Sequence, residues 1–156
     1  MNEFAAKKLG EVLAFSQIGV TVFEKGATAL NTVLGEHADS VVSSLKTQSE
    51  NIIAIAAEAG VIDITRLKSE KTGAKLLSMA ELYIGDEWDN SAELLEWLGF
   101  FEGAAIVHWK LVHGAGEALA HQKLSELATE GITFHTDLLN AVSSAIEEYA
   151  KQKVTA

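Results

Sequence analysis

The chain has 156 residues, 48% of them hydrophobic, which is enough for one domain with a substantial core and few for two. Its 22 acidic and 12 basic side chains give a formal net charge of −10, which repels phosphate backbones and argues against nucleic acid as a partner. The absence of cysteine excludes disulfides, thiolate nucleophiles and sulfur-ligated zinc. No apolar run reaches the roughly eighteen residues of a membrane span, and the N-terminus lacks signal-peptide character. We therefore expect a single cytoplasmic domain over residues 1–156.

The first half of the chain predicts long helices, because it contains no proline to end them. Two adjacent apolar rows that step by three and four residues predict one helix over about 3–34. Gly35 interrupts this pattern, and a second helix follows over about 37–59. The segment 61–90 predicts a long connection with a break at Gly73 and a shorter helix after it.

The second half predicts an antiparallel pair of helices. Asn90 followed by Glu93 is typical of a capping box, which starts a third helix over about 91–120. A fourth helix follows over about 123–151. The predicted fold class is therefore all-α, a bundle of four long helices with a long helical crossover between helices 2 and 3.

This layout resembles the ferritin-like superfamily over most of the chain. The resemblance implies a mid-bundle di-iron site made of two glutamates and two Glu-x-x-His motifs. Ile132 stands where such a motif would need a glutamate before His135, so the di-iron motif is absent.

Two histidines lie near the middle of the third and fourth helices. A tight turn near residues 121–122 would place His108 and His135 at the same height, both facing the interior. A buried neutral imidazole needs a partner for its donor and its acceptor. Ser16 and Gln48 lie on the inner faces of the first two helices, and Glu102 is the acid closest to the apolar arc of the third. These five residues either bond to one another or bind a metal, a haem or a small polar ligand, with His108 and His135 as the metal or haem ligands.

Two further groups have charged or metal-binding side chains. His113, Glu117 and His121 are spaced by four residues and share one ridge, which predicts either a surface zinc site or an exposed edge with an ion pair. The basic cluster formed by Arg66, Lys68, Lys71 and Lys75 is typical of a solvated helix face, and the sequence does not define its role.

No phosphate-binding loop, dinucleotide loop, nucleophile elbow or zinc-protease motif occurs, so we expect a non-catalytic protein without a cofactor. The third helix has a wider apolar arc than a bundle member needs. We therefore expect self-association, as a homodimer, or binding of a protein partner through Trp88, Trp97 and Phe100. The alternative is a binder of a metal, haem or small polar ligand at His108 and His135. A third hypothesis is an amphipathic coat on a hydrophobic particle, because the proline-free helices resemble those of phasins.

Overall fold

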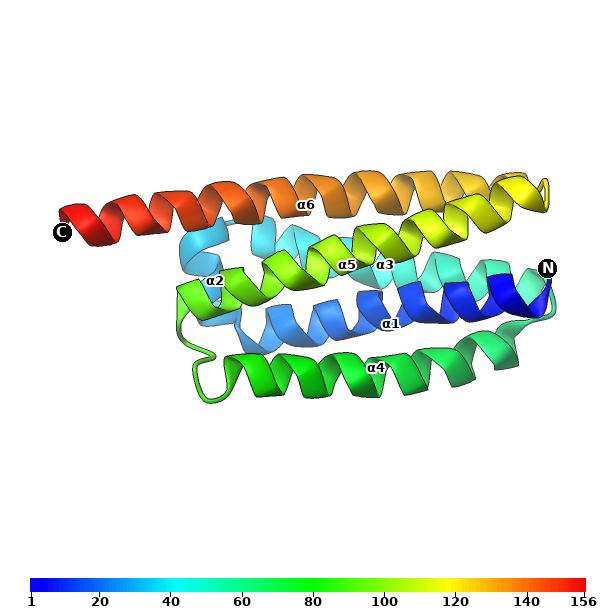
Figure 1. The fold of residues 1–156 in the computed structure, drawn as a ribbon, viewed down its shortest axis with the longest axis horizontal. Coiled ribbons are helices and arrows are strands. Elements are labelled where there is room, and N and C mark those ends of the chain that lie inside the picture. Colours follow the sequence, from blue (N-terminus) through cyan, green and yellow to red (C-terminus); the bar gives the residue numbers. More distant parts are fainter.

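The computed structural model describes all 156 residues and contains helices as its only regular secondary structure (Figure 1). The all-α prediction is confirmed. None of the helices combines the length and apolar character needed to cross a membrane. The six helices are α1 (Glu3–Lys25), α2 (Ala27–Leu34), α3 (His37–Glu58), α4 (Ile62–Ile84), α5 (Ser91–Ala118) and α6 (Gln122–Thr155).

The N-terminal segment forms two helices, where the sequence pattern predicted one. The break falls at Gly26, whose backbone has φ −94° and ψ 16°. A Cβ atom at this position would come within 2.8 Å of Leu94 at the start of α5. The chain bends where α5 packs against it, and the apolar period continues through the bend, which is why the pattern does not reveal it.

Segment 61–90 is also more regular than predicted, because α4 continues through Gly73 without a break. Gly73 is buried, and its Cβ position would lie 3.8 Å from Ile18 of α1. Gly10 of α1 lies even closer to α4, since a Cβ there would be 2.5 Å from the carbonyl oxygen of Thr65. The two glycines therefore act in helix–helix packing, and α4 lies along α1 as a full helix of the fold.

The helices lie nearly parallel to the long axis of the molecule (Figure 1). Helix α1 is enclosed by its neighbours, and every residue from 9 to 16 is buried. Helices α5 and α6 form an antiparallel hairpin, and the C-terminal end of α6 extends beyond the other helices. The observed end of α6, at Thr155, lies a turn beyond the predicted end near 151.

Close packing between α5 and α6 depends on Gly131. A Cβ atom there would overlap the indole ring of Trp109, which is completely buried. We expect Gly131→Ala to lower the free energy of unfolding by about 1–3 kcal/mol, because the core has no room for the methyl group. The matched change Gly114→Ala adds a methyl group to an exposed helical position with open space around it. It should raise stability by about 0.5–1 kcal/mol through helix propensity. Urea unfolding of both variants checks this, and equal effects would contradict the packing argument.

Candidate functional site

Four polar side chains form a layer across the middle of the bundle, one from each of the helices α1, α3, α5 and α6. The members of this polar layer are Ser16, Gln48, Glu102 and His135. All four are buried, and Ser16, Glu102 and His135 have no solvent-accessible surface. The buried core consists of a larger and a smaller cluster of apolar side chains, and the polar layer lies near the boundary between these two clusters. These are four of the five residues that the sequence indicated for the interior.

Hydrogen bonds connect the polar layer from one side of the bundle to the other. The hydroxyl of Ser16 lies 2.6 Å from Oε1 of Gln48 and 3.1 Å from the carbonyl oxygen of Val12, and the shorter contact marks Gln48 as its main acceptor. Nε2 of His135 lies 3.1 Å from the same oxygen, and Nδ1 of His135 contacts Oε2 of Glu102. A separation of 2.6 Å is typical of an O–H···O bond and short for N–H···O, which supports placing the amide oxygen of Gln48 on this side.

Both ring nitrogens of His135 therefore face oxygen atoms that accept hydrogen bonds. A neutral imidazole has only one N–H to donate. With this orientation of the Gln48 amide, one proton of the Glu102–His135 pair lies on Nε2 and a second lies between Nδ1 and the carboxylate. With both protons present the pair is neutral overall, which is the form that a dry interior favours.

The polar layer does not have the arrangement of a catalytic site. Both nitrogens of His135 are already occupied, and the hydroxyl of Ser16 bonds to Gln48 instead of to the imidazole. A nucleophile needs contact with its base, and a general acid needs access to a substrate. Oε1 of Glu102 has no partner, and the same is true of Nε1 of Trp97 and of Trp109. These three atoms all belong to α5. Because a buried polar atom without a partner costs free energy, burial of apolar area must offset their missing hydrogen bonds.

His108 does not join this layer, which corrects the prediction that both imidazoles face the interior. The neighbouring residue, Trp109, stacks on His135 with ring centroids 6.5 Å apart, so the backbone at His108 lies about level with His135, as expected. Its own side chain points toward α1 and keeps 31% of its surface exposed. Nδ1 of His108 donates to the carbonyl oxygen of Ala104 across 2.8 Å, and its ring lies 4.9 Å from that of Phe15. A two-histidine site for metal or haem is therefore not assembled.

His108 instead belongs to a charged group that the sequence analysis missed. Its Nε2 lies 3.8 Å from Glu11, a carboxylate that is only 9% exposed. Lys8 and Lys68 approach the same carboxylate to 3.0 and 3.4 Å. Glu11 is the only charged residue in the buried stretch from 9 to 16, and that position was the available signal. The group joins α1, α4 and α5, which gives one residue of the basic cluster a structural role.

The ridge of His113, Glu117 and His121 does not form a metal centre. The three side chains line a shallow groove at the α5–α6 turn. His121 is the N-cap of α6, and its Nδ1 accepts a hydrogen bond from the backbone N–H of Leu124 across 3.3 Å. Nowhere in the chain do three or more histidine or acidic side chains gather in an arrangement that could hold a metal ion. Glu117 is exposed and forms no ion pair, so the geometry favours an exposed edge without the predicted pair.

The three aromatic residues predicted for an interface differ in exposure. Trp97 is only 4% exposed and packs in the core, which corrects that prediction. Trp88 is half-buried beneath the ammonium group of Lys25, 4.2 Å from its ring. Phe100 is 64% exposed and remains available for contact.

The hydrogen-bond pattern predicts how Glu102 tolerates substitution. In Glu102→Gln the amide can donate to Nδ1 of a neutral His135 ring, which keeps its proton on Nε2 for Gln48. We expect this variant to lose less than about 1.5 kcal/mol of stability. Glu102→Leu leaves the ring without its partner and should lose about 3–5 kcal/mol. Urea unfolding followed by tryptophan fluorescence measures both losses. Similar losses for the two variants would contradict the proposed protonation of the pair.

Comparison with known proteins gives no match, since no family model, curated protein or solved structure is significantly similar to this chain.

Proposed function

We propose that this protein is a non-catalytic helical bundle that self-associates as a homodimer through one face of α4 and α5. The observation that carries the proposal is a row of exposed apolar side chains on these helices, here called the α4–α5 surface. It comprises Met79, Leu82, Tyr83, Phe100, Val107 and Leu111, which are 40–87% exposed. Monomeric proteins rarely leave a contiguous apolar patch larger than a few hundred Å² in contact with water.

The two helices meet at one end of this surface, where Tyr83 of α4 packs against α5. Phe100, Val107 and Leu111 are spaced by seven and four residues, which places them on one ridge of α5. The ring of Tyr83 on α4 lies 5.4 Å from that of Phe100 in an edge-to-face arrangement. The Tyr83 hydroxyl donates to Glu96 across 3.0 Å, and this bond raises the pKa of the phenol above its ordinary value. Tyr83 thus remains a hydrogen-bond donor that closes the gap between α4 and α5.

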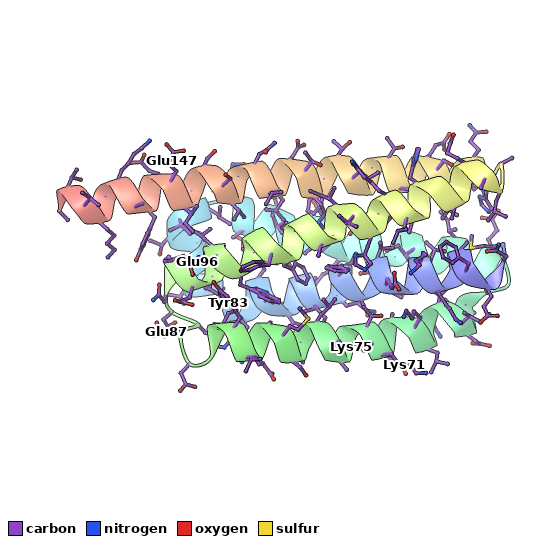
Figure 2. All side chains as sticks on the ribbon, in the orientation of Figure 1. Lys71, Lys75, Tyr83, Glu87, Glu96 and Glu147 are labelled. Carbon is purple, nitrogen blue, oxygen red and sulfur yellow. The ribbon has the colours of Figure 1, made fainter.

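Charges at the two ends of the surface support a second copy of the chain as the partner. Figure 2 shows Lys71 and Lys75 along α4, while Glu87 and Glu96 lie near Tyr83 at the far end. A two-fold axis pairs the same surface on both subunits. An antiparallel dimer would therefore set the basic end of each subunit against the acidic end of the other. Parallel pairing would instead bring like charges together.

The layout supports this proposal in a second way. We interpret α1, α3, α5 and α6 as the four-helix bundle and α4 as its helical crossover, in the manner of the ferritin-like superfamily. A crossover helix packed on the outside of α1 has one flank that no other helix of the chain covers. The acidic, cysteine-free composition fits a cytoplasmic protein that acts through protein contacts.

Removing one aromatic side chain from the α4–α5 surface tests the proposal. Phe100→Ser should raise the dimer dissociation constant by at least about tenfold. In a two-fold symmetric dimer one substitution removes a buried ring from each subunit. Val154→Ser is the control, because Val154 is 86% exposed on the protruding end of α6, away from this surface. Sedimentation velocity over a range of concentrations measures both. A wild-type protein that stays monomeric at high concentration would overturn the proposal.

Charge reversal tests the antiparallel arrangement. The variant Lys71→Glu/Lys75→Glu is acidic at both ends, and Glu87→Lys/Glu96→Lys is basic at both ends. Each should dimerise at least about tenfold more weakly than wild type at low salt, because exposed pairs contribute about 0.2–1 kcal/mol each. An equimolar mixture of the two variants should recover a heterodimer, and salt should weaken it. If the mixture stays as weak as the separate variants while wild type dimerises, the antiparallel geometry is wrong.

A further inference from the structure

A groove with polar walls lies between α3 and α6, away from the α4–α5 surface. Helix α6 packs mainly on α5 and touches α3 only lightly, which leaves this seam open. The groove has a cavity volume of about 310 Å³. Side chains that line it from α3 are Ser44, Thr47, Gln48 and Asn51, and α6 contributes Glu130 and Phe134.

The polar layer fixes how Gln48 faces this groove. Its Oε1 accepts a hydrogen bond from Ser16 and lies 3.1 Å from Nε2 of His135, so the oxygen is held toward the interior. Its Nε2 has no partner in the protein and is not sealed from solvent. Because the carboxamide is planar, anchoring the oxygen inside turns the two N–H donors toward the groove. A mobile surface glutamine would not present its donors in one fixed direction.

The remaining lining defines the chemistry of a ligand. The side chains of Ser44, Thr47 and Asn51 make no hydrogen bond within the protein, whereas several other threonines bond to their own helix backbone. Glu130 is the only charged residue in the groove, and no cation accompanies it. An anionic ligand would be repelled by Glu130, and a simple ammonium ion offers no acceptor to the N–H groups of Gln48.

Hydroxyl groups suit this lining, because each one can accept a hydrogen bond from the N–H groups of Gln48 and can donate one to an oxygen atom of the groove. Phe134 is half-buried and adds an apolar wall suited to the C–H face of a sugar ring. We propose that the α3–α6 groove binds a neutral, hydroxyl-rich molecule of monosaccharide size, which is anchored by the N–H groups of Gln48. This site is independent of the dimer surface.

NMR titration of the full-length protein tests the proposal. The probes are glucose, galactose and myo-inositol, with glucose 6-phosphate as the anionic counterpart. At least one neutral probe should cause saturable shifts of the Gln48 side-chain amide and of the Trp109 indole, which stacks on His135. Glucose 6-phosphate should bind at least tenfold more weakly than glucose. If no neutral probe shifts the Gln48 amide, or if the phosphate binds as well as glucose, the proposal is wrong.

Substitutions then locate the site. Thr47→Val/Asn51→Leu alters only exposed groove residues, so the fold should be retained, and binding should weaken at least tenfold. The control Thr21→Val changes an exposed residue of α1 outside the groove and should leave binding unchanged. Equal affinity of the groove variant and the control would place the ligand elsewhere and overturn the assignment.

Discussion

The polar layer is the constraint on which the rest of the structure depends. Apolar side chains alone would let neighbouring helices slide, because leucine and alanine contacts are similar at successive turns. A slide of one turn, about 5.4 Å, would separate His135 from both Gln48 and Glu102 and leave buried polar atoms unpaired. The layer takes one side chain from each of α1, α3, α5 and α6, so it sets the register of all four helices together. Buried polar groups are known to specify helix register at some loss of stability, and this network has the same form.

The register of α5 also decides which of its side chains face outward. Glu102 points into the polar layer, and His108 lies six residues later, about 120° around the helix axis. That rotation carries His108 toward α1 and α4, where it meets Glu11. Phe100, two residues before Glu102, is rotated well away from the interior and stays exposed. The same internal contact that satisfies one histidine thus excludes the other and creates the apolar row on the surface.

The sequence predicted the helical class and the inward residues of the layer, because Ser16, Gln48 and His135 interrupt otherwise apolar rows with polar groups. It did not predict the direction of His108, because apolar residues surround α5 on so many sides that its pattern does not define an inner face. Trp97 was assigned to the surface for the same reason. Gly73 was expected to mark a break because a glycine marks a close approach of helices as often as a break, and Gly26 was expected to lie within a helix because the apolar period continues through it. Their neighbours, Leu94 and Ile18, come from distant parts of the chain.

The arrangement of the helices keeps the two proposed binding regions apart. Helix α1 packs against α3, α4 and α5, while α6 packs on α5 and meets α3 across the groove. The α4–α5 surface and the α3–α6 groove consequently lie on different sides of the bundle, so an antiparallel dimer would leave both grooves open. Glu102 on α5 and Gln48 on α3 are nevertheless joined through His135.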